Sequence, residues 1–291
     1  MVTGLARHGD VTIAYEQLGP AGGEPLLLVM GLGMQLLSWP DEFCAMLVER
    51  GFCVVRFDNR DAGRSTHFAR AGNPGLLRML ARPGSVAPYR LTDMADDAAA
   101  VLDAVGWPTA HVAGASLGGM ISQTLAIRHP DRVRTLTSIM STPSPRIGRP
   151  RPAALAALGI PPATSRDAAG ERMVRVFRAI GSPRYPLEEQ ALRELGRRAY
   201  DRGHDPAGAR RQLAAIRASG DRRPGLAGVR VPTLVLHGDA DPLVRVSGGR
   251  ATAAAVPGAR LVVYPGMGHD LPRPLWRELV EELCALVGRP G

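Results

Sequence analysis

The stretch GASLG at residues 114–118 reads as G-x-S-x-G and lies between a predicted strand and a predicted helix. Residues 109–113 form a short β-type run, and residues 120–128 have the pattern of a helix. In so tight a strand-to-helix turn, the serine backbone is strained and its hydroxyl is held out over the sheet edge. This context favours a nucleophilic role for Ser116 over the structural alternative, a glycine-rich turn that contains a serine.

Strand-like and helix-like segments alternate along most of the chain. Further apolar or alternating runs predict strands at 11–16, 26–30, 52–57, 133–140, 233–237 and 261–264. Helical spacing of apolar residues predicts helices at 39–50, 93–105, 246–255 and 274–287. Because apolar strands alternate with helices, the chain is predicted to form an α/β fold with a mostly parallel sheet flanked by helices.

The alternation pauses between residues 143 and 224, where no convincing strand pattern occurs. Helical patterns within this segment cover 171–180, 187–200 and 207–218. The predicted organisation is therefore a first part of the α/β core at 1–142, a helical insertion at 143–224 and a second part of the core at 225–291.

Positive charge is concentrated in and just after this insertion. The chain carries a formal net charge of +9 and contains no lysine, and residues 143–230 hold 18 arginines against 8 acidic residues. These arginines are not interleaved with aromatic residues and match no nucleic-acid motif, so we expect no nucleic-acid partner. We interpret the arginine-rich segment as a solvated helical face rather than as a docking surface. A weak attraction of anionic substrates to this segment is an alternative that stays open.

Composition is that of a globular protein, with 45% hydrophobic and 22% charged residues. No apolar run approaches the length of about 18 residues that a membrane span needs, and residues 1–10 lack the pattern of a signal peptide. Three scattered cysteines have neither metal nor redox spacing, so buried thiols are expected at Cys44, Cys53 and Cys284. We expect a cytoplasmic protein; the oligomeric state is left open.

Two later strand ends carry the partners that a serine nucleophile needs. His269 lies in a glycine-flanked loop after the strand at 261–264, and Asp239 and Asp241 lie in the loop after the strand at 233–237. Serine is a poor nucleophile at neutral pH, so the histidine is predicted to accept its proton and an aspartate to orient the imidazole. Asp241 is favoured because Asp239 has a ready role in fixing the turn.

An acyl-transfer site also needs donors for the developing oxyanion. The N–H group of Leu117, directly after the nucleophile, is predicted to supply one. The N–H group of Leu32, in the loop after the strand at 26–30, is predicted to supply the second.

With these residues the chain resembles the α/β-hydrolases over nearly its whole length, and Ser116, Asp241 and His269 match their triad. The resemblance implies an eight-stranded, mostly parallel sheet and a helical cap inserted before the last two strands. The family has His-Gly before the oxyanion loop, whereas this chain has Met30-Gly31. Within the superfamily, the motifs at 28–31, 38–40, 56–66 and 264–269 resemble the aclacinomycin methylesterase group, which hydrolyses carbomethoxy esters of anthracycline polyketides.

Methionines and one tryptophan cluster around the predicted site. A flexible apolar lining suits a bulky hydrophobic group, although core packing explains at least half of these side chains equally well. The candidate substrate-binding residues are Gly31, Met34, Trp39, Met120, Met140 and Met267. Arg60 and Asp61 are interpreted as a turn-stabilising pair rather than as catalytic groups.

The sequence thus predicts a serine hydrolase that cleaves carboxylic esters through an acyl-enzyme, with no metal or organic cofactor. The expected substrate is a small-molecule ester with a bulky hydrophobic group, for which a polyketide methyl ester is one candidate. Haloalkane dehalogenases and epoxide hydrolases of this fold use aspartate as the nucleophile, so Ser116 argues against both. Lactone hydrolysis and cofactor-free perhydrolase or haloperoxidase-like chemistry use the same triad and stay open, as do carbon–carbon bond hydrolysis and acyl transfer. A ligand-binding receptor on the same fold is the alternative that is not an enzyme.

Overall fold

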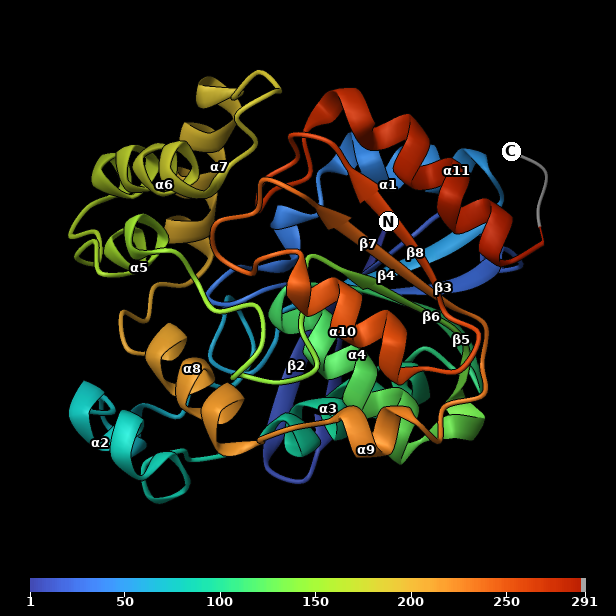
Figure 1. Cartoon of the computed structure of the whole chain (residues 1–291), viewed down its shortest axis with the longest axis horizontal. Helices are drawn as coiled ribbons and strands as arrows, with labels where there is room; N and C mark the ends of the chain where they lie inside the picture. Colours follow the sequence, from blue (N-terminus) through green and yellow to red (C-terminus); the bar gives the residue numbers. More distant parts are fainter. Residues whose placement is uncertain (289–291) are drawn as a thin grey trace.

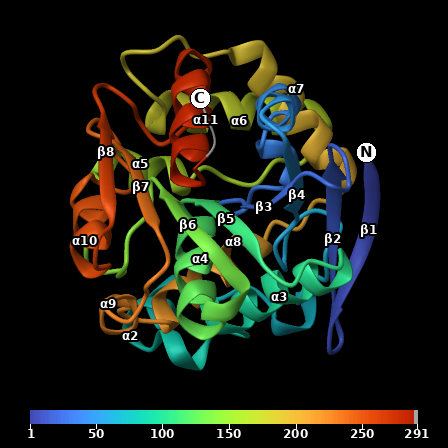
Figure 2. The ribbon, with the colours of Figure 1, turned by 90° about the vertical axis from the view of Figure 1, so that its right-hand side faces the viewer.

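An eight-stranded sheet crosses the molecule with helices on both faces (Figure 1). The computed structural model describes residues 1–288, apart from the side chains of residues 76, 80 and 158. The strands are β1 (Val2–His8), β2 (Val11–Leu18), β3 (Glu24–Val29), β4 (Phe52–Phe57), β5 (Ala110–Ala115), β6 (Val133–Ile139), β7 (Thr233–Gly238) and β8 (Arg260–Tyr264). Their order is β1-β2-β4-β3-β5-β6-β7-β8, with β1 at one edge and β8 at the other (Figure 2).

Six neighbouring strands of the sheet, β4-β3-β5-β6-β7-β8, are parallel, and β2 joins them antiparallel to β4. Every residue of β4, β5 and β7 is buried, which explains why these strands read as continuous apolar runs. The parallel arrangement brings the carboxyl ends of β3, β5, β7 and β8 to one edge of the sheet. That edge is where loops of a parallel sheet place functional side chains.

Helices cover both faces of the sheet. On one face lie α1 (Asp41–Glu49) and α11 (Trp276–Leu286), and on the other lie α3 (Leu91–Ala104), α4 (Leu117–Arg128) and α10 (Ser247–Ala255) (Figure 1). The two faces hold separate apolar clusters, one containing α3 and α4 residues and the other containing α1 and α11 residues. Helix α2 (Leu76–Ala81) lies outside this layer, and short 3-10 turns cover Leu36–Ser38, Ala69–Ala71, Pro83–Ser85, Pro130–Arg132 and Arg273–Leu275.

Between β6 and β7 the described residues form helices and no strand, as predicted. These helices are α5 (Pro152–Leu158), α6 (Arg166–Ile180), α7 (Glu189–Arg202), α8 (Gly208–Ala218) and α9 (Arg223–Leu226). Helices α5 and α6 share a small apolar cluster of their own. Helix α8 instead contributes Ala215 and Ile216 to the main core, so α5–α7 form the outlying part of the insertion (Figure 1). The domain boundaries at 142 and 224 stay predictions.

Arg60 and Asp61 have structural roles, but they do not pair with each other. Arg60 donates two hydrogen bonds to Asp97 of α3, with N–O distances of 2.6 and 2.7 Å. Asp61 accepts two from Arg211 of α8, at 2.9 and 2.7 Å, and one from the Tyr89 hydroxyl at 2.6 Å. The two residues therefore join the turn after β4 to two different helices, which corrects the interpretation as one pair.

No helix among the described residues is both long enough and apolar enough to cross a membrane. The three cysteines are buried and form no disulfide bond with one another, as predicted from their scatter.

Candidate active site

Ser116 occupies the turn between β5 and α4, in the strained backbone conformation that the sequence predicts. Its φ and ψ angles are 57° and −117°, a region that residues other than glycine rarely adopt. The Ser116 N–H donates to Ile139 O at 2.9 Å, and the Ser141 hydroxyl donates to Ser116 O at 2.7 Å. These bonds to the end of β6 hold the strained peptide, so the hydroxyl projects beyond the sheet edge.

The turn passes so close to β3 that a side chain at Gly118 is excluded. A Cβ atom there would lie 2.0 Å from Val29 O and 2.5 Å from the Val29 carbonyl carbon. Backbone atoms in a buried strand cannot move aside cheaply. This close approach is the reason for the second glycine of the motif.

His269 connects Ser116 to Asp241 through two hydrogen bonds. The Ser116 Oγ to His269 Nε2 distance is 2.9 Å, and the His269 Nδ1 to Asp241 Oδ2 distance is 2.7 Å. Because the buried Asp241 carboxylate accepts a hydrogen bond from Nδ1, the imidazole proton is fixed on Nδ1. Nε2 is then free to accept the serine proton. The structure brings together the three residues that the sequence proposed as a triad.

Asp241 is itself held rigidly. Its Oδ1 accepts hydrogen bonds from the N–H groups of Leu243 and Val244, both at 2.8 Å, which leaves Oδ2 for His269. His237 lies beside it, with Nε2 3.6 Å from Asp241 Oδ2, but donates to Val244 O at 2.7 Å. Burial lowers the pKa of His237, so this second imidazole is neutral and structural.

Asp239 takes the turn-fixing role that the sequence assigned to it. Its Oδ1 accepts a hydrogen bond from the Gly266 N–H group at 2.6 Å. This bond ties the loop after β7 to the loop after β8 and thereby supports the segment that carries His269. The geometry therefore separates the two aspartates in the direction that the sequence favoured.

The predicted oxyanion donors flank the serine. A Cβ atom on Gly31 would lie 3.2 Å from Ser116 Cβ, so the loop after β3 runs directly against the nucleophile. The N–H groups of Leu32 and Leu117 donate to no other protein group in the described part of the chain. Leu117 is the first residue of α4, where an N–H group has no partner within the helix. Two unpaired donors thus remain beside Ser116.

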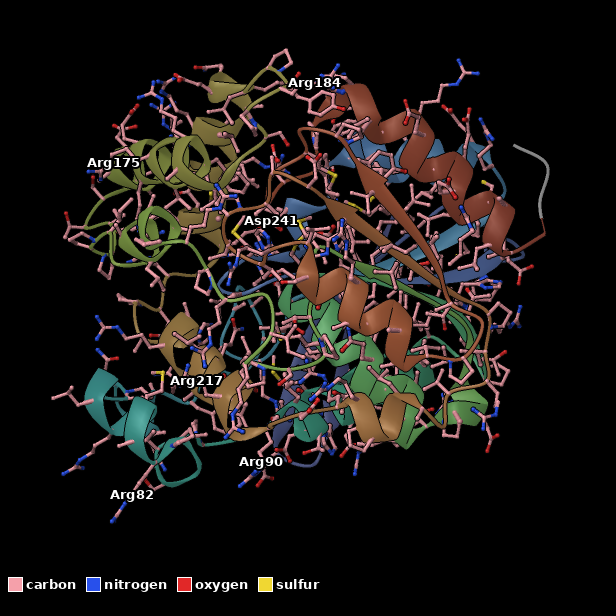
Figure 3. The ribbon with its side chains drawn as sticks, viewed as in Figure 1. Arg82, Arg90, Arg175, Arg184, Arg217 and Asp241 are labelled. Atoms are coloured by element: carbon pink, nitrogen blue, oxygen red, sulfur yellow. The ribbon has the colours of Figure 1, made fainter. Side chains whose placement is uncertain are left out.

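Ser116 and His269 open into a cavity of about 490 Å³. Three of the predicted substrate-binding residues line it, namely Gly31, Met34 and Met140, and so does Leu32. Met140 is one of three residues other than glycine with positive φ among the described residues (φ 41°). Figure 3 shows Asp241 in the interior of the molecule, between the strand ends and α5–α7, while Arg82 and Arg175 lie at the periphery.

Three other predicted substrate-binding residues lie in the core instead and do not line this cavity. Trp39 is fully buried and stacks on Phe43, with ring centroids 5.9 Å apart. Met120 packs with the α3 and α4 cluster on one face of the sheet, and Met267 is fully buried on the other. Nearness to the motif in sequence does not decide on which side of the sheet a side chain points. This corrects the prediction for Trp39, Met120 and Met267.

The far wall of the cavity comes from the insertion, in which no substrate-binding residue was predicted from the sequence. Apolar side chains of two helices face inward: Val176, Phe177 and Ile180 of α6, and Ala191, Leu192 and Leu195 of α7. Both sets have i, i+3 and i+4 spacing, which was the available signal. Arg198 of α7 also lines the cavity, whereas other arginines of these helices pair with acids, such as Arg193 with Glu171 and Glu189.

One group outside the cavity has the composition of a metal site. Asp61, His67 and Asp205 bring three potential ligand atoms within 4.8 Å of one another. However, Arg211 donates hydrogen bonds to both Asp61 and Asp205. The guanidinium already supplies the positive charge that a cation would bring, so the group is explained as an ion-pair network.

The sequence profile described as "alpha/beta hydrolase fold" matches residues 24–272. The chain belongs to the α/β-hydrolase family. It is 31% identical to rhodomycin D methylesterase of Streptomyces peucetius, over 98% of each chain, and 32% identical to a putative carbamate hydrolase of Variovorax paradoxus, over 88% of each. A solved hydrolase from Pseudomonas aeruginosa PA01 is 26% identical, covers 98% of both chains and superposes with a TM-score of 0.73. The similarity to a methylesterase confirms the resemblance predicted from the sequence motifs.

Proposed function

We propose that this α/β-hydrolase cleaves carboxylic esters through an acyl-enzyme formed on Ser116. One observation carries the proposal: an unbroken hydrogen-bond chain runs from Asp241 through His269 to Ser116 Oγ, and Ser116 and His269 line a mostly apolar cavity. Two unpaired N–H donors stand beside the serine. A nucleophile, an oriented base and oxyanion donors are the parts that acyl transfer requires.

Acylation follows from this geometry. His269 Nε2 accepts the serine proton as Oγ attacks the ester carbonyl, and the Asp241 carboxylate stabilises the resulting imidazolium. The carbonyl oxygen becomes an oxyanion that the N–H groups of Leu32 and Leu117 stabilise, each worth about 3 kcal/mol of barrier. Collapse of the tetrahedral intermediate breaks the bond to the alcohol oxygen, and His269 gives that oxygen its proton.

Deacylation uses the same groups in reverse. Water enters the site of the departed alcohol, and His269 Nε2 accepts its proton as the oxygen attacks the acyl carbon. The second tetrahedral intermediate collapses with loss of Ser116 Oγ, which takes back the proton from His269. The carboxylic acid leaves, and the triad returns to its starting protonation state.

The cavity favours a bulky hydrophobic substrate. Its walls are mostly apolar, and a volume of about 490 Å³ is within the range of sites for drug-sized ligands. Similarity to rhodomycin D methylesterase supports a methyl ester of a bulky polyketide, in which the leaving alcohol is small and the acyl part fills the cavity. A cytoplasmic location stays a prediction, supported by three buried cysteines that form no disulfide bond with one another.

Ser116→Ala tests the proposal directly. We expect the variant to keep its fold and to lose turnover of short aryl esters, because no nucleophile remains to form the acyl-enzyme. Circular dichroism and thermal unfolding check the fold, and release of the chromophore measures turnover. Unchanged hydrolysis by the alanine variant would contradict the proposal.

A substrate panel then tests the substrate class. It compares methyl esters of bulky polyketides with simple acyl esters, lactones and peroxide-dependent oxidation. We expect the highest kcat/KM on the bulky methyl esters. A higher value on lactones, or activity only with peroxide, would replace ester hydrolysis by one of those reactions on the same triad.

A further inference from the structure

A half-buried carboxylate follows the histidine of the triad. Asp270 lines the cavity together with Ser116 and His269. Its Oδ1 accepts a hydrogen bond from the Ser182 hydroxyl, and the oxygen of that hydroxyl accepts one from the Gly268 N–H group at 2.8 Å. Ser182 lies just after α6, in the insertion. The carboxylate is therefore held in one orientation from across the cavity wall.

Protein groups leave this carboxylate only partly satisfied. The Ser182 hydroxyl donates to Asp270 Oδ1, and this hydroxyl and the Ser182 N–H group both favour the ionised form of the carboxyl. The charge of His269 favours the ionised form and that of Asp241 opposes it, and no salt bridge joins Asp270 to an arginine among the described residues. A carboxylate offers about four acceptor sites, so acceptor capacity remains in a cavity with apolar walls.

The two arginines that line the cavity are engaged elsewhere. Arg273 Nη1 lies 3.8 Å from Glu188 Oε1, and Arg198 Nη2 lies 3.8 Å from Asp41 Oδ2. Burial raises the pKa of Asp270, which reflects the cost of ionising it away from water. A bound donor would offset that cost, since hydrogen bonds to charged groups are stronger than those between neutral groups.

We propose that Asp270 is a substrate-recognition residue that accepts a hydrogen bond from a hydroxyl or ammonium group of the ester, and that Ser182 positions its carboxylate. The substrate would then be a bulky apolar ester with a hydrogen-bond donor near the reacting carbonyl. This inference rests on the proposed ester hydrolysis at Ser116. It adds a polar requirement to a cavity that otherwise selects for size and apolar character.

Matched substrates measure this recognition. Aryl esters with acyl chains of increasing length are prepared in three forms, ending in a methyl, a hydroxyl or an ammonium group. At the chain length that reaches Asp270, we expect wild-type kcat/KM to be higher for a donor-bearing chain than for the methyl-ended chain. The hydroxyl and ammonium arms identify which donor the site takes.

Asp270→Asn keeps an acceptor for Ser182 but removes the charge. We expect it to reduce the preference for the donor-bearing chain by about 10- to 100-fold, the loss of one hydrogen bond to a charged group. Ser182→Ala should reduce the same preference by a smaller factor, because the carboxylate remains but is no longer oriented. A purely structural role for Asp270 would lower turnover of all three forms alike and leave the preference unchanged.

Glu194→Gln is the matched control, since Glu194 is another acid on the cavity wall and lies 3.9 Å from Arg166 rather than beside His269. We expect its preference ratio to equal that of the wild type. The inference is overturned if no chain length shows a donor preference, or if Asp270→Asn retains it. Turnover of the methyl-ended esters, and its loss in Ser116→Ala, tests the ester hydrolysis itself separately from this inference.

Discussion

At the scale of single residues, the site depends on which of two neighbouring aspartates touches His269. Asp241 Oδ2 lies 2.7 Å from His269 Nδ1, whereas Asp239 accepts from the backbone of Gly266. The two carboxylates are two positions apart on one loop, yet one orients the imidazole and the other fixes a turn. Isosteric substitution at each position can therefore separate the two roles.

Asp241→Asn should cost far more activity than Asp239→Asn. An amide at 241 favours the wrong imidazole tautomer and cannot stabilise the imidazolium, which we expect to lower kcat by about 10⁴-fold, as in other serine triads. Asn at 239 still offers an oxygen to the Gly266 N–H, so we expect a loss within about tenfold. Steady-state kinetics on an aryl ester checks both variants, and the reverse ranking would move the acid to Asp239.

At the scale of elements, the strand–turn–helix unit of β5 and α4 has to fit against β3. The fit is set by backbone rather than by side chains, because Gly118 faces the Val29 carbonyl group. This contact also places the N-terminus of α4 near the loop that carries Leu32. Stability and oxyanion geometry therefore depend on the same close approach.

Gly118→Ala should destabilise the protein by several kcal/mol, about 3–5, because the new methyl group would overlap a buried carbonyl that cannot relax. Urea unfolding of the variant measures the change in the free energy of unfolding. Gly22→Ala is the control, since a Cβ there meets nothing within 4 Å and its effect should be within about 0.5 kcal/mol. Equal stability of the two variants would contradict the tight contact between α4 and β3.

Other elements show where local patterns lose information. Strand β1 was not predicted from the sequence, because it is a mostly exposed edge strand with little apolar patterning. Helix α6 begins earlier than the predicted residue 171, with the Ser165 hydroxyl accepting from the Ala168 N–H at 3.2 Å. Helix α5 lies in a proline-rich stretch in which no helix was predicted, and its Pro152 is tolerated because it stands in the first turn.

At the scale of the whole molecule, the insertion is tied to the core by buried polar contacts as well as by apolar packing. Arg202 at the end of α7 donates to Asp58 Oδ2 at 3.1 Å, and Asp58 also accepts from the N–H groups of Leu36 and Arg64. The Asp58 side chain is fully buried. The pair therefore links the insertion to the loop that leads away from the oxyanion donor Leu32.

Arg202→Ala should cost about 2–4 kcal/mol at about pH 7, because it leaves a buried carboxylate without its cation. Burial raises the pKa of Asp58, and its hydrogen-bond donors and Arg202 oppose that rise. A carboxyl with a raised folded pKa is favourable when protonated, below its unfolded pKa, and that contribution is lost as the pH rises through the folded pKa. Without Arg202 the ionised form of Asp58 is less favourable, so the free energy of unfolding falls further as the pH rises. The variant should therefore be closer to wild type at about pH 4.

Denaturant unfolding of both proteins at the two pH values measures this difference. Arg166→Ala serves as the control, because Arg166 and Asp201 form an exposed ion pair on the same insertion and such pairs contribute little. A loss in Arg202→Ala that does not depend on pH would mean that Asp58 is not the group responsible.

The sequence by itself determined the fold class and the three residues of the proposed triad. Each of them lies in a loop next to a strand with a strong local pattern, and a parallel sheet necessarily brings such loops to one edge. The choice of Asp241 over Asp239 and the oxyanion donors Leu32 and Leu117 followed in the same way, because they depend on backbone position along single loops.

Only the tertiary structure decided what surrounds Ser116. Met34 and Met140 line the cavity while Met120 and Met267 lie in the core, because the side of the sheet that a methionine faces depends on how helices and loops pack over it. The insertion supplies the opposite wall and the hydroxyl of Ser182, which reaches Asp270 across 88 positions of sequence. Local patterns carry no information about such contacts, since folding alone brings those segments together.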